Sequence, residues 1–583
     1  MARRAWRPGT YRWRISPPQE AAAALARAAG TAPLVAQVLL NRGVTDAESA
    51  KAFLEPKLTD LHDPSLLPGA TEAARRIVRA VRDRERVVLY GDYDVDGMTG
   101  VAVLYECLRM LGAEPDWYVP HRLDEGYGVN ADAVRKLAAD GANLLVTVDC
   151  GISAVGPLKE AQAAGLDVIV TDHHLPGPEL PPATAIVHPS LPNGGYPCEH
   201  LAGAGVAFKL AWQVAREACG EKRVDEPMRR FLLNATCLAG LGTVADVVPL
   251  TDENRVLAAH GLRGLQATEH PGLRALIDAA GLAGDRLDTY AVGFRLAPRL
   301  NASGRMGHAR LALELLTRAE PDRCHEIAEY LNKQNTERQK VEQEIAAQAA
   351  EQVVSRGLDG DDHRAIVLGS DDWHGGVVGI VASRLVERFS KPTILVSLNG
   401  ADVAHGSARS IPDFHMRDAL AACAEHLEGF GGHAMAGGIK LRPEKLEPFA
   451  EAFGRYAVEA LTSEQLRPTL QIDAEVPLRA MQYHAVEHLS RLAPFGEGNP
   501  RPVVAVRGCD IVNPPKRIGR SGNTASMIIA QNGATIRAVG FGMGDLADLL
   551  VGVNRVDIVA EPVINNFRGQ TSVELKLRDV AWK

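Results

Sequence analysis

Short apolar runs alternate with runs of helical period between about residue 86 and residue 189. The apolar runs, typical of buried strands, occur at 87–90, 116–120, 144–148, 166–171 and 185–188. Helical spacing of apolar residues occurs between them, at 99–111, 130–139 and 155–164. Strands that alternate with helices form right-handed βαβ units around a parallel sheet. The pattern therefore predicts an α/β fold for this part of the chain.

A long polar stretch from Pro321 to Arg356 predicts one helix that connects two lobes. Its apolar residues recur at helical spacing, and Gly357 follows as a stop signal. About 35 residues at 1.5 Å each span roughly 50 Å, which suits a connector. Beyond this helix, a second α/β lobe is predicted from strands at 365–368, 392–396 and 403–408 and a helix at 377–389.

Beyond about residue 470 the pattern changes to strands separated by glycine-containing turns. Strands are predicted at 503–506, 525–529, 535–539, 556–563 and 572–577. Five strands in about 110 residues favour a small barrel of the OB type. The expected domains are an N-terminal segment at 1–70, the parallel-sheet domain at 71–318, the connecting helix at 319–357, the second α/β domain at 358–462 and the barrel at 463–583.

Composition supports a folded, multidomain chain. The 583 residues are too many for one core, and 46% are hydrophobic. No apolar run approaches the roughly 20 residues that span a bilayer, and the eight cysteines form no C-x-x-C pair. We therefore expect a soluble cytoplasmic protein with reduced thiols. The net charge of −8 means that a polyanionic ligand requires a local basic groove.

The strongest chemical signal is G-D-Y-D-V-D-G, which places Asp92, Asp94 and Asp96 directly after a predicted strand. Three carboxylates so close together repel one another unless cations neutralise them. A calcium loop requires a glutamate at its twelfth position, but that position holds Val103. The motif favours a catalytic metal site, with a plain acidic turn as the alternative.

Three further motifs add metal ligands at strand ends or in apolar surroundings. Asp149 follows the apolar run L-L-V-T-V, and T-D-H-H follows another with Asp172, His173 and His174. Asp246 lies in the apolar stretch G-T-V-A-D-V-V-P-L, where a charge needs a partner or a metal. Carboxylates and imidazoles without thiolates indicate Mn²⁺ or Mg²⁺ rather than structural zinc.

The order and spacing of these four motifs resemble the DHH phosphoesterase superfamily. F-G-G-H-A-M-A-G-G at 430–438 resembles the substrate-binding signature of the DHHA1-type second domain of that superfamily. Four more motifs resemble single-stranded-DNA exonucleases of the RecJ type, at 297–306, 373–385, 406–410 and 492–500. The resemblance extends from about residue 40 to the end. It implies two α/β lobes of DHH and DHHA1 type, joined by the long helix, and a C-terminal OB-like β-barrel.

The resemblance also implies a site with two Mn²⁺ or Mg²⁺ ions. Asp149 would bridge both ions and Asp94 would bind one of them. The other ion would be bound by Asp96, His173 and Asp246. His174 would contact the phosphate or assist proton transfer, and Asp172 would orient a histidine. Small-substrate members have a histidine where this chain has Tyr90, so Asp92 is the candidate to complete the shell of the first ion.

The activity implied by the resemblance is degradation of single-stranded DNA from the 5′ end to mononucleotides, in DNA repair and recombination. Candidates for binding phosphate and substrate are Arg122, Arg299, Asn301, Arg305, Ser407, Arg409 and His433. The barrel would extend the DNA track through Lys516, Arg517, Arg520, Arg537, Phe541, Phe567 and Arg568. For each arginine, a solvated surface residue is the alternative. A helicase or a single-strand-binding protein is a candidate partner, and no membrane is expected.

Two other functions remain as alternatives. One is a phosphoesterase for small substrates, namely oligoribonucleotides, cyclic dinucleotides or pyrophosphate. The barrel and the connecting helix argue against it, because such enzymes need only two lobes. The other is a non-catalytic relative that binds single-stranded DNA. The retained carboxylates and His173 argue against that alternative.

Overall fold

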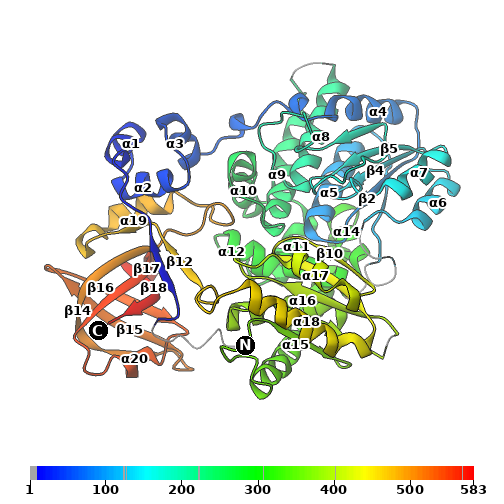
Figure 1. Cartoon of the computed structure of the whole chain (residues 1–583). Coiled ribbons are helices and arrows are strands. Elements are labelled where there is room, and N and C mark those ends of the chain that lie inside the picture. Colours follow the sequence, from blue (N-terminus) through cyan, green and yellow to red (C-terminus); the bar gives the residue numbers. More distant parts are fainter. Residues whose placement is uncertain are drawn as a thin grey trace. The chain divides into compact units, whose positions relative to one another are not determined.

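The computed structural model of this chain describes residues 9–121, 125, 128–220, 223–305, 308–400, 402–567 and 569–582 (Figure 1). Two compact units are formed, each from segments that are distant in sequence. The first, here called the parallel-sheet unit, comprises Ala47–Thr336 and Leu492–Pro500. The second, here called the composite unit, comprises Met1–Asp46, Glu337–Arg491 and Arg501–Lys583.

Five parallel strands form the sheet of the parallel-sheet unit, in the order β3-β2-β4-β5-β6. Their bounds are β2 Val87–Gly91, β3 Asp116–Tyr118, β4 Leu144–Val148, β5 Asp167–Thr171 and β6 Ala185–Val187. The chain runs from β2 to the edge strand β3 and then back past β2 to β4. The strand order therefore reverses between β2 and β4, and open α/β sheets bind ligands at such a point. This topology confirms the predicted α/β fold.

Apolar side chains cover both faces of this sheet because successive strand residues point to opposite sides. Leu89 and Val146 belong to the larger core, whereas Val88 and Leu145 belong to the smaller one. The helices are α3 Ala47–Leu54, α4 Ala70–Arg82, α5 Val95–Met110, α6 Ala131–Ala139, α7 Val155–Ala163, α8 Gly203–Cys219, α9 Glu226–Ala245, α10 Asp252–Leu265, α11 Pro271–Ala279, α12 Thr289–Ala291, α13 Ala297–Arg305 and α14 Ala309–Thr317.

The helix predicted from Pro321 to Arg356 is present as α15, Pro321–Ser355. Its first part contributes Ile327 and Leu331 to the core of the parallel-sheet unit. Its last part contributes Ile345 and Val353 to a core of the composite unit. One helix thus connects the two units through its own apolar face.

A five-stranded mixed sheet forms the second α/β lobe, within the composite unit, in the order β10-β11-β9-β8-β7. The strands are β7 Ile366–Ser370, β8 Thr393–Ser397, β9 Ala404–Arg409, β10 Gly429–Gly432 and β11 Ala436–Leu441. Helix α16, Gly375–Phe389, packs against β8 and β9, and α18, Leu446–Ala460, packs against β7. α17, Met416–Ala422, packs against β10 and β11.

The predicted C-terminal barrel is also confirmed, with longer strands than the apolar runs indicated. These strands are β13 Ala474–Glu475, β14 Val504–Ile518, β15 Thr524–Gln531, β16 Ala534–Phe541, β17 Arg555–Phe567 and β18 Gln570–Ala581. Their order is β13-β14-β15-β16-β18-β17, and an additional pairing of β14 with β17 partly closes the sheet. The pairings continue past the apolar runs into polar strand ends, which hydrophobic periodicity does not mark.

The N-terminal segment joins the composite unit through a parallel strand pair. Strand β1, Arg12–Ile15, pairs with β12, Thr469–Ile472. The Trp13 indole N–H donates to a carboxylate oxygen of Asp579 at 2.6 Å. Helices α1, Ala22–Ala29, and α2, Pro33–Asn41, follow in the same unit. The start of the chain therefore packs beside residues more than 400 positions away.

A second long-range attachment seats the loop Leu492–Pro500 in the parallel-sheet unit. The buried Arg255 guanidinium donates to the carbonyl oxygens of Leu492 at 3.0 Å and Ala493 at 2.9 Å. It also lies 3.8 Å from the ring of Phe53. The backbone N–H of Leu250 donates to the carbonyl of Glu497 at 2.8 Å. These bonds fix the loop beside the segment that follows Asp246.

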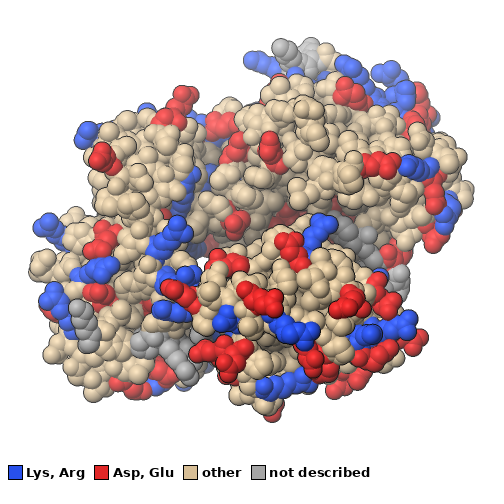
Figure 2. All heavy atoms as spheres, viewed as in Figure 1, with Lys and Arg blue, Asp and Glu red and all other residues tan. Residues whose placement is uncertain are grey.

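Among the described residues, no single helix has the length and apolar character to cross a membrane, although the bent pair α1–α2 passes the same test. On the face in Figure 2, acidic and basic side chains are interspersed over the surface. This mixture agrees with the modest net charge of −8.

Candidate metal centre and substrate site

Three adjacent strands each end one residue before an aspartate. Asp92 follows β2, Asp149 follows β4 and Asp172 follows β5. The backbone N–H groups of these aspartates donate to Val148, Thr171 and Val187, at 3.2, 3.0 and 3.2 Å. The sheet pairing thus continues by one residue, and it holds the three aspartates side by side at the carboxyl edge.

The G-D-Y-D-V-D-G motif forms the start of α5, which begins at Val95 rather than at the expected Thr99. Asp94 is the N-cap, and its carboxylate accepts the N–H of Gly97 at 3.0 Å. Asp96 lies in the first turn, where its carboxylate accepts the N–H groups of Gly203 at 2.7 Å and Ala204 at 2.9 Å. The amino ends of α5 and α8 therefore both direct N–H groups at these carboxylates, which favours negative charge.

Two groups of ligand atoms lie next to each other at this edge, and a third group overlaps both. The first contains Asp92, Asp94 and Asp149, the second contains Asp96, His173 and Asp246, and the third contains Asp149, His173 and His174. Within each group the ligand atoms lie within 4.8 Å of one another. Asp149 also reaches the second group, because its Oδ1 lies 3.1 Å from His173 Nε2. The structure thus brings together all six residues that the sequence indicated as metal ligands.

The donor atoms at the centre fit divalent cations. Asp149 Oδ1 and His173 Nε2 are buried, and neither makes a hydrogen bond to any residue that the structure describes. Buried polar atoms without hydrogen bonds are costly in folded proteins unless an ion satisfies them. Five carboxylates and one imidazole form an oxygen-rich donor set typical of Mn²⁺ or Mg²⁺ sites.

Asp149 adopts a backbone conformation that is uncommon for residues other than glycine. Its φ is 62°, in the left-handed region, where Asp and Asn are tolerated better than most residues. Such conformations concentrate at functional sites. The sharp turn after β4 directs this carboxylate toward both ligand groups.

Two glycines leave the space that the carboxylates occupy, and the sequence reasoning missed both. A Cβ atom on Gly203 would lie 2.5 Å from Asp149 Oδ1, and one on Gly242 would lie 2.6 Å from Asp96 Oδ1. The sequence carries a partial signal, because Gly203 and Gly242 lie in helices α8 and α9, where glycine is unfavourable without a packing reason.

Gly203→Ala is expected to weaken Mn²⁺ binding by about 10- to 100-fold, the range seen when groups that orient metal ligands are lost. The new methyl group would displace the Asp149 carboxylate, which contributes to both ligand groups. Isothermal titration of the metal-free protein measures this change. Gly156→Ala is the matched control, because a Cβ atom there meets no other atom within 4 Å. Equal affinities of the two variants would refute the expected contact.

Burial and mutual repulsion raise the pKa values of the central carboxyl groups. Burial first, and then the charge of Asp94, raise the pKa of Asp96 to about 7. Burial, Asp96 and Asp94 raise the pKa of Asp246 to about 8. The pKa of Asp149 is raised well above its usual value by burial and by the neighbouring aspartates. The metal-free centre therefore retains protons near neutral pH, and cations must displace them.

The two histidines of T-D-H-H have opposite protonation preferences. Burial and the neighbouring His174 lower the pKa of His173 to about 4, so its imidazole is neutral and able to bind a cation. Although burial opposes it, the hydrogen bond from His174 Nδ1 to Asp172, 2.7 Å long, raises the pKa of His174 to about 9. His174 is therefore an imidazolium at neutral pH in the metal-free protein.

Asp172 orients the histidines. Its Oδ1 accepts the backbone N–H groups of His173 at 2.8 Å and His174 at 3.1 Å, and its Oδ2 accepts that of Ile152 at 2.9 Å. The buried His188 adds a contact that the sequence reasoning missed, because its Nε2 donates to the carbonyl of His174 at 2.8 Å. This double support fixes the turn that presents both imidazoles.

The thermal stabilisation by Mn²⁺ is expected to increase from pH 6.5 to pH 8.5. Because Asp96 and Asp246 bind protons more tightly in the folded protein than in the unfolded chain, the metal-free protein loses stability as pH rises toward their pKa values of about 7 and 8. Bound cations remove the repulsion. In the folded protein His173, with its pKa near 4, does not titrate in this range. His174, whose pKa is raised to about 9, also makes the metal-free protein lose stability as the pH rises. Melting temperatures with and without Mn²⁺ test this; a shift independent of pH would contradict it.

Three of the candidates for phosphate binding in the parallel-sheet unit, Arg299, Asn301 and Arg305, belong to α13. The Oδ1 atom of Asn301 accepts the backbone N–H of Val95 at 3.2 Å, so Asn301 also supports the turn that carries Asp94 and Asp96. The Nε of Arg299 donates to Asn332 at 3.2 Å. Arg122 and the side chain of Arg305 lie outside the described residues.

Ser407, Arg409 and His433 belong to the second α/β lobe. Ser407 and Arg409 point from β9 toward α16, where a Cβ atom on Gly379 would lie 3.1 Å from Ser407 Oγ and 3.2 Å from an Arg409 guanidinium nitrogen. The glycine thus makes room for both groups. His433 is exposed in the turn between β10 and β11, where the preceding Gly432 has a φ of 141°.

Tyr90 takes no part in the ligand groups, since its hydroxyl donates to the carbonyl of Gly128 at 3.2 Å and its ring is fully buried.

In the barrel, two of the arginines that were expected to contact DNA already form ion pairs with carboxylates. Arg517 pairs with Asp545 and Asp548, and Arg537 pairs with Glu574. The side chains of Phe567 and Arg568 lie outside the described part of the chain.

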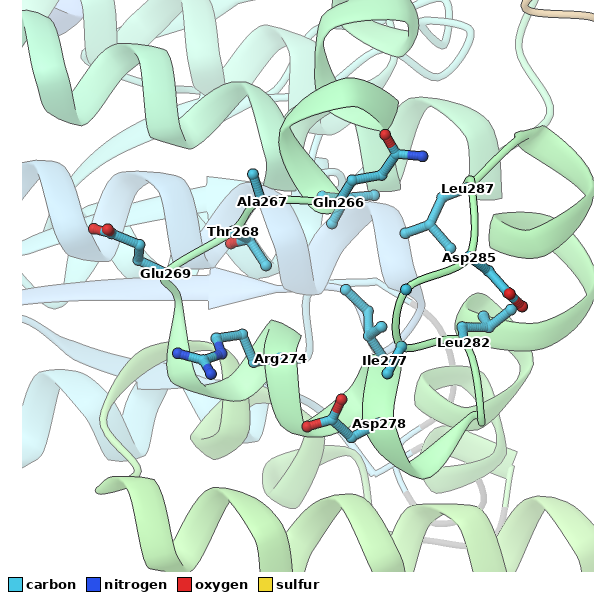
Figure 3. Close-up of a pocket in the computed structure, with 13 residues that line it drawn as sticks. Gln266, Ala267, Thr268, Glu269, Arg274, Ile277, Asp278, Leu282, Asp285 and Leu287 are labelled. Atoms are coloured by element: carbon cyan, nitrogen blue, oxygen red, sulfur yellow. The ribbon is translucent and has the colours of Figure 1, made fainter.

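A surface pocket of about 380 Å³ lies against α11 (Figure 3), and none of the residues that line it is a candidate metal ligand. Three carboxylates, those of Glu269, Asp278 and Asp285, line it together with the guanidinium of Arg274. The excess of negative charge makes this pocket unsuited to a phosphodiester strand. The metal centre is therefore the better candidate for the reaction site.

Three family models match successive parts of the chain. The DHH family N-terminal domain matches residues 86–239, the DHHA1 domain matches 362–459 and the RecJ OB domain matches 472–579. The first match contains Asp92 and Asp149, and the second contains Arg409 and His433.

Named relatives are similar over nearly the whole length. The single-stranded-DNA-specific exonuclease RecJ of Bacillus subtilis is 40% identical over 98% of this chain and 71% of its own length. The Escherichia coli RecJ of the same description is 33% identical over 94% of this chain and 96% of its own length. The crystal structure of Thermus thermophilus RecJ in complex with Mn²⁺ covers 98% of this chain and 80% of that chain, with a TM-score of 0.83 and 30% identity.

A similarity of this extent covers the sheet, the ligand groups, the second lobe and the barrel together. The metal-bound state of the Thermus protein agrees with a donor set that fits Mn²⁺ or Mg²⁺. The chain therefore belongs to the RecJ family of single-stranded-DNA-specific exonucleases.

Proposed function

We propose that this protein hydrolyses single-stranded DNA from the 5′ end to mononucleotides, in DNA repair and recombination, with two Mn²⁺ or Mg²⁺ ions. The observation that carries the proposal is the pair of ligand groups that adjoin at Asp149. Asp149 would bridge the ions, with Asp92 and Asp94 on one side. Asp96, His173 and Asp246 would hold the other ion.

The bound ions would act as Lewis acids on the scissile phosphate and lower the pKa of an attacking water. The protein holds the side chains that would bind the ions in place before the ions arrive. Helix N–H groups fix Asp96, and the left-handed turn fixes Asp149. Such prior positioning avoids reorganisation during the reaction, which is a large part of catalysis by charged sites.

His174 is proposed to contact the phosphate and to supply a proton. Its side chain is 42% exposed, and in the metal-free protein, although burial opposes it, the hydrogen bond to Asp172 raises its pKa to about 9, so that it carries a positive charge at neutral pH. An imidazolium beside a phosphodiester donates a charge-assisted hydrogen bond to a phosphate oxygen or protonates the departing oxygen. Asp172 would act through His174 as a positioning residue.

Recognition of the 5′ end is proposed for the second α/β lobe. A terminal phosphate carries more negative charge than an internal one and suits an arginine with a neighbouring hydroxyl. Ser407 and Arg409 lie together beside Gly379 and provide that pair. His433, exposed in its glycine-rich turn, would contact the strand nearby in the same lobe. Arg299, Asn301, Arg122 and Arg305 would bind other phosphates.

DNA labelled at either end tests the polarity and the role of Arg409. With Mn²⁺, the wild type is expected to release the 5′ label first, as mononucleotide, and to prefer a 5′-phosphate over a 5′-hydroxyl. Arg409→Ala should reduce that preference about 10-fold or more, because a charge-assisted contact is lost. Arg442→Ala is the control, since Arg442 is an exposed arginine of the same unit that pairs with Glu428.

Other outcomes would support the alternatives. Release of the 3′ label first would contradict the proposed polarity. Intact DNA together with hydrolysis of a cyclic dinucleotide or pyrophosphate would favour a small-substrate phosphoesterase. Metal binding and DNA binding without hydrolysis of any of these would favour a non-catalytic relative.

A cytoplasmic location and a helicase or single-strand-binding protein as partner complete the proposal. An exonuclease restricted to single strands needs a source of unwound DNA, which a helicase supplies. Copurification of such a protein with the full chain would test the partnership.

A further inference from the structure

Helix α19, Tyr483–Ser490, carries two histidines one helical turn apart in the composite unit (Figure 1). Its apolar face buries Val486 and Leu489, and the helix packs against β17, β18 and α2. His484 and His488 are four positions apart in the sequence, so their side chains project from the same face of the helix. The sequence contains no other two histidines at this spacing.

The two imidazole rings already lie together. Their centroids are 4.1 Å apart, with an angle of 57° between the ring planes. A metal ion binds imidazole nitrogens at about 2.0–2.1 Å, so two nitrogens on one ion lie about 3 Å from each other. Small rotations of the two side chains bring rings at this distance to that separation. The same spacing on one face of a helix presents two histidines to zinc in metalloproteases.

The other nitrogen of each ring faces an acceptor. Nδ1 of His488 lies 3.4 Å from the hydroxyl of Thr31, and Nδ1 of His484 lies 3.7 Å from the carboxylate of Glu487. Among the described residues, none forms a hydrogen bond or an ion pair with Nε2 of either ring. Histidines that bind metals donate one ring N–H to such an acceptor and hold the ion through the other nitrogen. The contacts therefore leave both Nε2 atoms available to one ion.

The position of the pair suits an ion from solution. The side chain of His484 is 74% exposed. Burial first, and then His484 and Arg491, lower the pKa of His488, so its imidazole binds a cation without having to release a proton. A pair of imidazoles favours Cu²⁺, Ni²⁺ or Zn²⁺ over Mn²⁺ and Mg²⁺. This preference differs from that of the carboxylate-rich metal centre.

We propose that His484 and His488 form a second metal site, which takes one late transition-metal ion, Cu²⁺, Ni²⁺ or Zn²⁺. Nε2 of each ring is a ligand, and water completes the coordination. Thr31 is a positioning residue that accepts the Nδ1 proton of His488. It lies 457 positions before that histidine, so the site also ties the N-terminal segment to α19. The inference does not depend on the proposed exonuclease function.

Isothermal titration of the full chain with the nitrilotriacetate complex of Ni²⁺ tests the site. The chelator leaves only two adjacent coordination positions open, which two imidazoles can fill together. Mg²⁺ in the buffer occupies the carboxylates of the metal centre. The wild type should bind one complex, and His484→Ala/His488→Ala should lower the affinity at least about 100-fold, since loss of a group that only orients a ligand already costs about 10- to 100-fold. Each single alanine variant should lose nearly as much, because one imidazole cannot chelate.

His363→Ala is the matched control, since His363 is an exposed histidine of the same unit outside α19. Its affinity should equal that of the wild type. Alanine favours helix, so the metal-free double variant should keep its melting temperature, which separates loss of ligands from loss of fold. Thr31→Val keeps the shape of the side chain but removes the acceptor, and it should lower the affinity about 10-fold.

Electron paramagnetic resonance of the wild type with the Cu²⁺ complex of the same chelator provides a measurement that needs no variant. The spectrum should show coupling of the copper electron to the nitrogens of two imidazoles. Coupling to a single imidazole, no binding by the wild type, or equal affinities of the wild type and the double variant would each overturn the site. These outcomes leave the exonuclease proposal untouched, because the titration measures binding and not hydrolysis.

Discussion

Replacing Asp149 with asparagine is expected to abolish DNA hydrolysis while raising the melting temperature of the metal-free protein. Asparagine keeps the shape of the side chain but removes the charge that belongs to both ligand groups. We expect a loss in rate of at least about 10³-fold, equivalent to roughly 4 kcal/mol of activation free energy.

The rise in stability has a separate cause. Burial and four neighbouring aspartates raise the pKa of Asp149, which shows that its negative charge is disfavoured in the folded protein without cations. At pH 8 the unfolded chain carries this charge and the folded, metal-free protein disfavours it, so asparagine, which does not ionise, should raise the melting temperature by a few degrees. Mn²⁺ should then stabilise the variant less than the wild type, because one shared ligand is missing.

Rates with single-stranded DNA and melting curves with and without Mn²⁺ measure both effects. Asp132→Asn is a suitable control, since Asp132 is exposed in the first turn of α6 and pairs only with surface groups in the described structure. Full activity of Asp149→Asn would reject the bridging role. A lower melting temperature of its metal-free form would reject the argument from repulsion.

Replacing Lys209 with alanine is expected to cost about 3–5 kcal/mol of unfolding free energy, because it leaves the buried Glu253 carboxylate without its cation. Both side chains are fully buried, and the ammonium lies 2.7 Å from Glu253 Oε1. The same carboxylate accepts the N–H of His62 at 3.0 Å and the hydroxyl of Tyr196. The loss should lower the melting temperature by roughly 10 °C.

Lys159→Ala is the matched control for this prediction. Lys159 also forms an ion pair at 2.9 Å, with Glu179, but both side chains are more than half exposed. Exposed pairs contribute about 0–1 kcal/mol, so its melting temperature should change little. Thermal or urea unfolding of the two variants compares them directly. Similar small losses would show that the buried pair is not needed for stability.

The candidate metal ligands illustrate what a sequence reveals about a site. Each of the three strand-end aspartates can be recognised from its neighbours in the sequence, because a charged residue directly follows an apolar run and marks a turn there. The D-V-D motif predicted a metal-binding role for a related reason, because like charges so close together indicate a neutralising cation. The sequence pattern did not predict that the helix begins at Val95. Asp94, which caps this helix with its carboxylate, has the same appearance in the sequence as a residue of an acidic turn.

The supports of the site were much harder to predict. Gly203 and Ala204 bind Asp96 through backbone N–H groups, which every residue other than proline possesses and which leave no mark in the side-chain pattern. Lys209 and Glu253 each look like ordinary charged helix residues until their helices pack together. An ion pair between residues so far apart in the sequence can be predicted only when the positions of both partners in the fold are known.

The sequence by itself determined the α/β pattern, the connecting helix, the barrel strands, the ligand types and the resemblance to the exonucleases, because these features depend on local period and residue chemistry. Only the tertiary structure decided that β2 lies beside β4, that β1 pairs with β12 and that Leu492–Pro500 packs on Arg255. It also brought Asp92 next to Asp149. The physical reason is that strand order and buried contacts are chosen by the packing of the whole core, which no local segment encodes.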